Sequence, residues 1–562
     1  MKRFPRLLWA ILVFAFIIRA WNLAAPDMAG DDATYAFRSV GYVDFIAAAN
    51  RQSTPVTWFD EPQWWQSLSF HDAPPLVFAL EHASFAFFGD NAVAARVPFV
   101  LAGTLSVFAI YLLGEFIGGE SLGLAAAAIM TLLNYPVWLS RIGYLDGMLI
   151  PSILFSLYFF FKAQKQPRNY WYWGLACGAG LLTKYTFLFL GPVFLGALLI
   201  RRRQAFKSRA FLQGCAIAVL LLMPVILYNV GMFRARGHLD AALSTLIGQH
   251  PADFAGLVRT GGFNALGVLT QFMSGGAFSP TVLLFAAVGV GILYATQSLE
   301  VFTVLIGGFL MALAELSVIG GIEWYGAILV PFVVLFTALG AVTLFRYLKN
   351  KIGNIATIAI IVLLAGMELT ATIQNQLLAH PLVASPLLPT AFSSPHNGYA
   401  ELENYIGRFY ADHAASSAII TYQEDGKQLA DYQKSAILAR FGGTVTGPTQ
   451  DQLVLYDERM NWFASLWTFE RRRLYDAEPI QSLWQFLEKT DGAHDFSFYR
   501  NFGMKTATII LTAENTQDNT QVDHAADVSA FAQKVESVLT PIAEIRNADG
   551  RVAFRVYTLS LQ

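Results

Sequence analysis

An apolar stretch near the start of the chain, followed at once by two acidic residues, decides the fold class. Residues 7–25 read LLWAILVFAFIIRAWNLAA, and residues 29–35 read AGDDATY. An apolar run of about 20 residues is long enough to cross the hydrocarbon core of a bilayer. Ionised side chains at a membrane edge are costly and usually functional. The pair Asp31-Asp32 therefore marks the end of a predicted transmembrane helix and a candidate site.

The composition of the whole chain supports a membrane protein. Of its 562 residues, 55% are hydrophobic and only 14% are charged, and the mean hydropathy is +0.46. Soluble domains typically contain about 25% charged residues. A formal net charge of -2 indicates no nucleic-acid partner. The two cysteines lie in apolar runs, which indicates buried thiols rather than a disulfide or a metal site.

Eleven apolar segments are predicted to be transmembrane helices, the shorter ones packed inside a bundle. They are residues 7–25, 94–114, 122–139, 147–162, 170–183, 185–200, 210–230, 280–297, 301–319, 323–345 and 353–373. The first segment follows Lys2, Arg3 and Arg6 but has no convincing small-residue cleavage site. This favours an uncleaved anchor over a signal peptide.

Basic residues between these segments predict the orientation. With the N-terminus in the cytoplasm, every strongly basic short loop lies on the cytoplasmic side, as the positive-inside rule requires. These loops hold Lys162, Lys165, Arg168, Arg201, Arg202, Arg203, Lys207, Arg209, Arg346, Lys349 and Lys351. The outer face then receives the acidic pair and the C-terminal part of the chain. We expect a protein of the bacterial inner (plasma) membrane.

Two domains are predicted from the change of composition along the chain. Residues 1–373 form a polytopic α-helical membrane domain, whose outer loop, residues 26–93, belongs to the active site. Residues 374–562 contain more charge and alternate strand-like runs, such as 417–422 and 506–511, with helical patterns. We predict a soluble extracytoplasmic α/β domain of about 180 residues, large enough for its own core. Because no catalytic motif stands out in it, we expect it to bind substrate or cover the active site.

Eight ionisable residues from distant parts of the chain share the outer face in this topology. They are Asp31, Asp32, His71, Asp72, Arg141, Asp146, Lys184 and Glu323. Taken singly, each is typical of a solvated loop charge or of a helix end. Together, beside an apolar cavity, they suit a reaction on a lipid phosphate. A carboxylate would deprotonate the acceptor, and Lys and Arg would neutralise the phosphate that leaves.

The order of these residues resembles that in the GT-C membrane glycosyltransferases of the protein O-mannosyltransferase and lipid A aminoarabinose transferase superfamily. The acidic pair is similar to the pair, usually Asp-Glu, in that family's first outer loop. The other similar stretches are Pro74-Pro75-Leu76, Phe88-Gly89-Asp90, Ala95-Arg96-Val97-Pro98, Arg141 to Asp146, Gly180-Leu181-Leu182-Thr183-Lys184, and Glu323-Trp324-Tyr325 with Pro331. One departure is Ala73, which stands where relatives carry Lys or His before the Pro-Pro.

This resemblance implies a GT-C fold and an inverting glycosyltransferase. The donor would be a polyprenyl-phosphate sugar, and the acceptor a protein, lipid A or a surface glycan, on the outer face of the membrane and among its lipids. Because cations already surround the phosphate and the sequence has no clean ligand set, neither a metal nor a cofactor is expected.

The resemblance also implies a role for each matching residue. Asp31 is the general base, Asp32 orients it or binds the sugar, and Asp146 positions the sugar or acceptor. The residues expected to bind or support substrate are Lys184 and Arg141 at the donor phosphate, Arg96 as a brace for the acidic pair, His71 or Asp72 in place of the missing Lys or His, and Glu323 and Tyr325 in the late loop.

Two alternatives remain open from the sequence. A secondary transporter or lipid flippase would also be apolar, but it should carry ionisable residues near the bilayer midplane on interrupted helices. An oligosaccharyltransferase-like enzyme with a lipid-pyrophosphate donor would carry a Trp-Trp-Asp signature in its soluble domain. Here the Trp-Trp is Trp64-Trp65, and Gln66 follows it.

Overall fold

The computed structural model divides the chain into two compact units. The structure describes residues 4–48, 51–53, 58–59, 63–201, 203–254, 264–274, 276–321, 323–378, 382–383, 388, 391–411, 452–476, 478–489, 496–501, 504–513 and 525–561. The first unit comprises Met1–Leu23, Leu68–Ser84 and Val93–Ser394, and the second comprises Ala24–Ser67, Phe85–Ala92 and Pro395–Gln562. The units therefore differ from the predicted division at 373/374, because part of the first loop belongs with the C-terminal residues.

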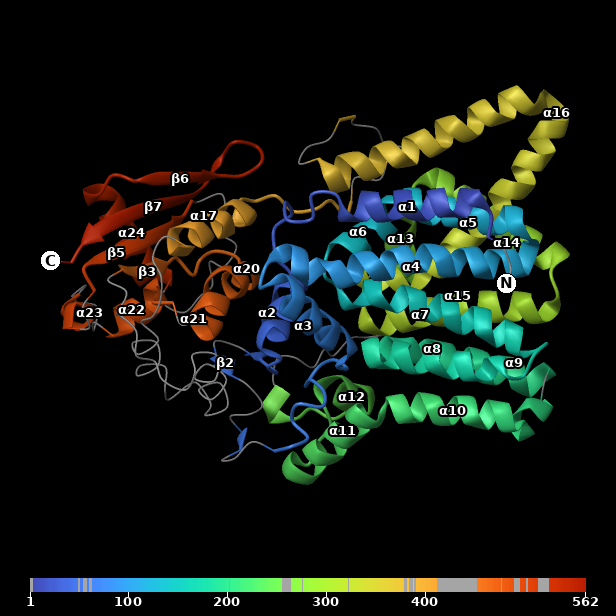
Figure 1. Ribbon diagram of the computed structural model, residues 1–562, viewed down its shortest axis with the longest axis horizontal. Coiled ribbons are helices and arrows are strands. Elements are labelled where there is room, and N and C mark those ends of the chain that lie inside the picture. The colour runs from blue at the N-terminus through green and yellow to red at the C-terminus, as the bar shows by residue number, and fades with distance from the viewer. Residues whose placement is uncertain are drawn as a thin grey trace. The chain divides into compact units, whose positions relative to one another are not determined.

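The first unit is a bundle of helices, most of which run side by side (Figure 1). Its helices are α1 (Arg6–Ala20), α3 (Leu76–Phe88, ending in the second unit), α4 (Ala92–Gly118), α5 (Glu120–Leu132), α6 (Asn134–Arg141), α7 (Leu145–Ala163), α8 (Asn169–Thr183), η2 (Tyr185–Phe189), α9 (Leu190–Arg201), η3 (Arg203–Lys207), α10 (Arg209–Leu221), α11 (Met223–Arg236), α12 (Ala241–Leu246), η4 (Ala252–Phe254), α13 (Ala265–Ser274), α14 (Pro280–Thr296), α15 (Leu299–Ile319), η5 (Trp324–Leu329), α16 (Val330–Thr372) and η6 (Ile373–Leu377). Helices lie over the predicted apolar segments, as expected of a helical membrane domain.

Length and apolar composition identify which described helices are able to cross a membrane on their own. There are four: α4, α7, α15 and the continuous stretch Trp324–Leu377. The pairs α5 with α6 and α10 with α11 are bent by 63° and 54°, and counting each pair as one span gives up to six. Since the remaining apolar helices are shorter, the predicted count of eleven stays a prediction.

Helix α16 unites the last two predicted segments in one bent helix. The bend is at Gly353, whose φ of 84° lies in the left-handed region that glycine adopts without a steric penalty. The first arm packs closely on α14. A Cβ at Gly340 of α16 would overlap the carbonyl oxygen of Phe285, and one at Gly289 of α14 would overlap that of Phe336. The two glycines therefore let the helix backbones approach each other, as small residues do in membrane bundles.

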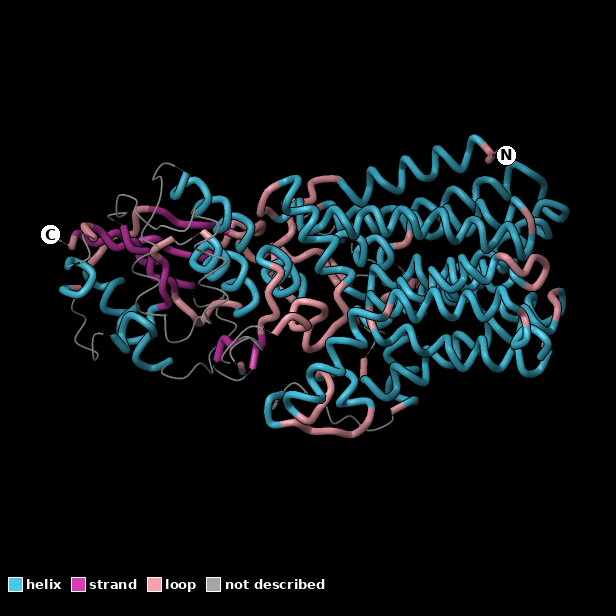
Figure 2. The backbone as a smooth tube through the Cα atoms, turned by 60° about the horizontal axis from the view of Figure 1, so that its bottom comes forward, coloured by secondary structure: helices cyan, strands magenta, loops and turns pink. Residues whose placement is uncertain are grey.

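The second unit contains a five-stranded mixed sheet (Figure 2). Its strands are β3 (Gln452–Tyr456), β4 (Ile480–Ser482), β5 (Thr506–Thr512), β6 (Ala543–Arg546) and β7 (Val552–Ser560) in the order β4-β3-β5-β7-β6. Strand β3 pairs in parallel with β4 and β5, whereas β7 pairs antiparallel with β5 and β6. The predicted strand at 506–511 is confirmed, and the one predicted at 417–422 lies outside the described residues.

Both faces of this sheet are covered, which explains the near-continuous apolar runs of its central strands. Leu453 and Leu455 of β3 enter one apolar cluster, and Val454 and Tyr456 enter the other, as the two-residue period of a strand requires. The helices of the unit are α17 (Tyr399–Ala411), α20 (Trp462–Ser465), η8 (Leu466–Glu470), α21 (Arg471–Tyr475), α22 (Leu483–Lys489), α23 (Ser497–Asn501) and α24 (Ala525–Val538).

The first-loop segment of the second unit forms helix α2 (Asp31–Gly41) and the hairpin of β1 (Ile46–Ala48) and β2 (Arg51–Ser53). Asp27, just before α2, is fully buried. Its carboxylate accepts hydrogen bonds from the backbone N–H groups of Asn397 and Ala400 at the start of α17, which leaves its charge at a helix N-terminus. Phe37 of α2 packs on Tyr475, with ring centroids 5.5 Å apart. These contacts hold α2 within the C-terminal unit.

Candidate active site

Two residues predicted for the site form a partly buried ion pair in the first unit. Asp146 lies in the first turn of α7, and Lys184 directly follows the end of α8. Lys184 Nζ donates to Asp146 Oδ2 at 2.6 Å, with the side chains 17% and 1% exposed. A charge-assisted hydrogen bond offsets part of the cost of taking both charges out of water. The two residues, which were predicted to share one membrane face, thus contact each other directly.

The late loop brings two more predicted residues to the same unit. Lys184 Nζ lies 4.2 Å from the centroid of the Tyr325 ring in η5, a cation–π geometry. Glu323, which is exposed, precedes η5, and its backbone carbonyl accepts a hydrogen bond from the Tyr135 hydroxyl of α6. Trp324, between the two, stacks on Tyr144 with ring centroids 4.9 Å apart. The aromatic contacts therefore fix the loop that places Tyr325 over the lysine.

Glu315 of α15 belongs to this cluster although the sequence analysis did not select it. Its carboxylate interacts electrostatically with Lys184 and Asp146. Its Oε2 atom is buried and accepts no hydrogen bond from the described part of the chain, and the same holds for Asp146 Oδ1. Buried polar atoms rarely lack a partner, so these two oxygens are candidates to accept hydrogen bonds from a bound molecule. The signal in the sequence is a single acid within the apolar run 301–319.

We call the group formed by Lys184, Asp146, Glu315 and Tyr325 the lysine cluster. Its cation bonds to one carboxylate, interacts electrostatically with a second, and is covered by a phenol ring. Such an arrangement can hold a phosphate oxygen on the ammonium group and sugar hydroxyls on the unsatisfied carboxylate oxygens.

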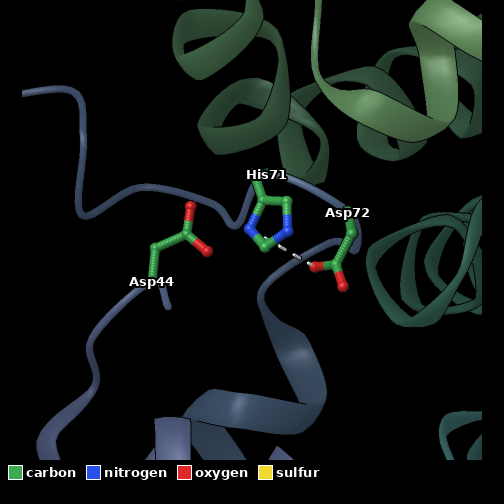
Figure 3. Close-up of side chains that lie close together, drawn as sticks. All are labelled: Asp44, His71 and Asp72. Atoms are coloured by element: carbon green, nitrogen blue, oxygen red, sulfur yellow. Dashed lines mark ion pairs between the residues drawn. The ribbon is translucent and has the colours of Figure 1, made fainter. Parts of the chain in front are cut away.

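His71 and Asp72 lie in the turn before α3 in the first unit (Figure 3). His71 Nδ1 lies 3.9 Å from Asp72 Oδ1; His71 is buried, and Asp72 is 38% exposed. The turn is closed by a bond from the Phe70 N–H to the Ala73 carbonyl at 3.3 Å. The His71 ring stacks on Phe254, with centroids 5.8 Å apart. The pair is therefore held in a defined place, with its acid accessible.

A buried carboxylate that the sequence analysis missed connects this turn with the lysine cluster. Asp240 accepts hydrogen bonds from the Tyr185 hydroxyl at 2.6 Å and from Asn229 Nδ2 at 2.8 Å, and it caps α12 through the Leu243 N–H. Removal from water raises the pKa of Asp240. Tyr185 is the neighbour of Lys184, and the Ala241 N–H donates to the His71 carbonyl at 2.6 Å.

The two predicted arginines of the first unit are buried and bond to the end of α1. Arg141 Nη1 donates to the carbonyls of Arg19 at 3.0 Å and Trp21 at 2.7 Å, and Arg96 Nη1 donates to that of Leu23 at 2.9 Å. Cations at a helix C-terminus are favourable, because the last carbonyls lack helical partners. Both residues thus have a structural function where they lie. Their predicted substrate contacts stay predictions.

The acidic pair occupies the first turn of α2 in the second unit. Asp32 is buried, and its Oδ1 accepts from the Gly30 N–H at 3.0 Å. The half-buried Asp31 accepts from the Tyr35 hydroxyl at 3.4 Å, one helical turn further on. Acids are favourable at a helix N-terminus. Arg38 of the same helix pairs with Asp44 at 3.2 Å.

Comparisons with known proteins agree with the family resemblance. Residues 72–228, which include Asp72, Arg141, Asp146 and Lys184, match the family described as dolichyl-phosphate-mannose-protein mannosyltransferase. Two Bacillus subtilis (strain 168) proteins, "Putative mannosyltransferase YkcB" and "Putative mannosyltransferase YycA", are each 26% identical to the chain, over 204 and 239 residues. These stretches are 35% and 41% of this chain, and 28% and 32% of the two relatives. The chain thus matches about a third of the length of these relatives.

A solved structure decides the architecture. The crystal structure of ArnT from Cupriavidus metallidurans bound to undecaprenyl phosphate aligns over 98% of this chain and 97% of that one, with a TM-score of 0.53 and 14% sequence identity. The chain has the GT-C fold. Together with the apolar helices, this fold makes it an integral membrane protein with a small C-terminal sheet. The resemblance inferred from the sequence is confirmed, and it favours a glycosyltransferase over the transporter alternative.

Proposed function

We propose that this GT-C protein is an inverting glycosyltransferase that moves a sugar from a polyprenyl-phosphate donor to a protein, lipid A or surface-glycan acceptor. The observation that carries the proposal is the lysine cluster, in which a partly buried ammonium group bonds to one carboxylate and interacts electrostatically with a second, and each carboxylate has an oxygen without a described partner. The undecaprenyl phosphate bound to ArnT, which has the same fold, supports a lipid phosphate as the leaving group here.

Lys184 stabilises the phosphate in this reaction. While the sugar leaves, negative charge develops on the phosphate oxygen that had been bonded to the anomeric carbon. A fixed cation that needs no reorganisation stabilises this charge more in the transition state than in the bound donor. Asp146 holds the ammonium group in place, and the Tyr325 hydroxyl and Arg141 provide further donors. The cations replace a metal, so the enzyme needs no divalent ion.

Sugar hydroxyls satisfy the two orphan carboxylate oxygens of the cluster. Asp146 Oδ1 and Glu315 Oε2 are acceptors without a described partner, and a pyranose supplies hydroxyl donors. The site would then reject a ligand that has the phosphate but no hydroxyls, because the buried acceptors would remain unpaired. His71 or Asp72 takes the donor contact of the residue that Ala73 replaces, and Glu323 completes the pocket.

Asp31 is the general base, and Asp32 orients it. The carboxylate takes the proton of the acceptor hydroxyl or amine, whose oxygen or nitrogen attacks the anomeric carbon. The bond from that carbon to the phosphate oxygen breaks, and polyprenyl monophosphate leaves with the bonding electrons. A single displacement inverts the configuration. The reaction takes place on the outer face, with the N-terminus in the cytoplasm, and the C-terminal domain binds the acceptor or covers the site.

The test is turnover by the purified full-length protein in nanodiscs. A panel of polyprenyl-phosphate sugars and candidate acceptors is supplied, and the release of polyprenyl monophosphate is measured. Wild-type protein should release it only with acceptor, and Asp146→Asn should lower the rate at least about 100-fold. The matched control is Lys207→Ala, since Lys207 is an exposed residue in η3. No release with any donor would contradict the proposal, and release of a pyrophosphate would support the oligosaccharyltransferase alternative.

The acceptor is identified by comparing cells with and without the gene. Mass spectrometry of envelope glycans, lipids and exported proteins should show one class of molecule that loses a hexose-sized or aminopentose-sized group when the gene is absent. An unchanged profile in cells that express the protein would argue for transport instead.

A further inference from the structure

The first unit also contains a groove. None of its lining residues belongs to the lysine cluster. It is lined by α5, α14 and the two arms of α16, and its volume is about 560 Å³. Figure 1 shows the two arms of α16 meeting at the bend and then running apart. The groove therefore exists because Gly353 turns the second arm back beside α5 at a distance from the first arm.

The walls of the groove are almost entirely apolar. Typical lining residues are Ala125, Ile129, Phe285, Val342, Ile358 and Ile361. The second arm also presents apolar side chains away from the bundle, among them Ile355 at 87% and Val362 at 64% exposed. Apolar surface of this extent is stable only against lipid tails or another apolar partner. In a membrane, hydrocarbon will fill the groove.

The two ends of the groove differ in charge. Arg346 and Lys349, both exposed, line it near the bend, together with Asn354. At the other end Glu368 lines it and accepts a hydrogen bond from Ser279. The cationic end belongs to the basic loop that the sequence places at the cytoplasmic membrane surface. A ligand that matches the groove thus has an anionic head and a long apolar tail.

The length of the groove also fits such a ligand. From Asn354 to Glu368 the second arm rises about 21 Å, at about 1.5 Å per residue. One leaflet of a bilayer contributes about 15 Å of hydrocarbon. A fatty acyl chain that starts at the basic end can therefore lie in the groove over the depth of its leaflet.

We infer that this groove binds one anionic glycerophospholipid, with its phosphate at Arg346 and Lys349 and an acyl chain between the arms of α16. The charge selects the class, since basic residues near a membrane surface attract anionic lipid head groups. A zwitterionic lipid would bring an ammonium group to the same two cations. The bound lipid fills the space between α5, α14 and α16 and so supports the helix that begins directly after Tyr325 and η5. This inference does not depend on the proposed transferase activity.

Native mass spectrometry of the full-length protein tests the inference. The protein is released from nanodiscs that contain equal amounts of phosphatidylglycerol and phosphatidylethanolamine, and the bound lipids are identified. Wild-type protein should keep one phosphatidylglycerol, and Arg346→Ala with Lys349→Ala should lower its occupancy at least about tenfold, as expected when two head-group cations are lost. The matched control is Lys351→Ala, since Lys351 also lies near the bend of α16 but does not line the groove.

A second test blocks the groove with one variant that does not change charge and compares it with a control variant. Ala365→Trp places an indole into it from the second arm, and the control Leu363→Trp places one on the exposed side of that arm. Only Ala365→Trp should lose the lipid, while both variants elute as folded protein. Equal retention in the two variants, or equal binding of both phospholipids, would overturn the inference. Displacement of the lipid by a polyprenyl phosphate would also overturn it, because the groove would then belong to the donor.

Discussion

The charged side chains of the lysine cluster and of the acidic pair of α2 differ in how far along the chain their bonding partners lie. In the lysine cluster, a cation from the end of α8 meets carboxylates from α7 and α15, and two carboxylate oxygens have no partner among the described residues. In α2, each aspartate accepts a hydrogen bond from a residue at most four positions away. The cluster is thus a long-range construction with unused acceptors, whereas each acid of the pair has at least one contact that is local in sequence. The cluster depends on the packing of several helices, so substitutions there should affect both folding and function.

The largest effect is expected from removing the cation of the lysine cluster. Lys184→Met should reduce turnover by about 1,000-fold, because the leaving phosphate loses its fixed charge. It should also destabilise the protein by about 3–5 kcal/mol, because Asp146 stays buried without its partner. Rates of polyprenyl phosphate release and thermal unfolding measure the two effects.

The double variant Lys184→Met with Asp146→Asn is the control for folding. It removes both charges, so it should regain most of the lost stability but none of the activity. If the double variant were as unstable as Lys184→Met, the pair would not be the electrostatic unit described above.

The acidic pair should behave differently when it is altered. Asp31→Asn should lower turnover by about 100-fold or more, because general base catalysis is lost, while the helix keeps its local hydrogen bonds. The unfolding temperature should change little, since Asp31 is half-buried and an amide oxygen still accepts from Tyr35. The measurement is the rate together with its pH profile, whose acidic limb should disappear. Turnover near the wild-type value would exclude Asp31 as the base.

A substitution at Glu315 tests the role of this carboxylate separately from that of Asp146. Glu315→Gln keeps the shape and one acceptor oxygen, so the expected loss is about tenfold, in the range of a single hydrogen bond to a charged group. The loss should appear mainly as a higher KM for the donor sugar, because Glu315 is proposed to accept sugar hydroxyls. Glu300→Gln at the other end of α15 is the matched control, and a loss there of the same size would refute a specific role.

The difference between the two regions also explains how much the sequence revealed. Asp31-Asp32 is visible as a pair because its neighbours are local in sequence. Asp146 and Lys184 were predicted to lie on the same membrane face, from the topology and the family resemblance, but their ion pair was not predicted. Glu315 was missed, because one acid in an apolar run gives no indication of which helix it will face.

Longer-range features of the fold were less visible in the sequence. The break near Gly353 was predicted as a boundary between two segments, but the sequence did not indicate that the second arm would leave a groove. The assignment of residues 24–67 to the C-terminal unit depends on Asp27, whose bonding partners lie 370 and 373 positions away. No local pattern predicts contacts of that range. Asp240 was missed for a similar reason, since the Tyr185 hydroxyl that donates to it is 55 positions away.

The smallest effect is expected in the sheet domain, and it concerns pH. Removal from water raises the pKa of Glu458 from its ordinary value of 4.5 to about 8. The folded state therefore binds more protons than the unfolded state between these values, and its stability falls as the pH rises from about 4.5 to about 8. Glu458→Gln should remove part of this slope, because an amide side chain does not titrate in this range. The amide oxygen still accepts from the Trp484 N–H, which lies 2.9 Å from Glu458 Oε1.

Between pH 5 and pH 8 the unfolding temperature should thus decrease less in Glu458→Gln than in wild type, by a few degrees in all. The exposed Glu401→Gln in α17 is the control and should follow the wild-type curve. If the two variants had the same slope, burial of Glu458 would not be a source of the pH dependence. Because neither substitution touches the lysine cluster, turnover at a fixed pH should stay the same. This outcome would show that burial of Glu458 in the sheet domain affects stability alone, whereas charge burial in the lysine cluster affects catalysis as well.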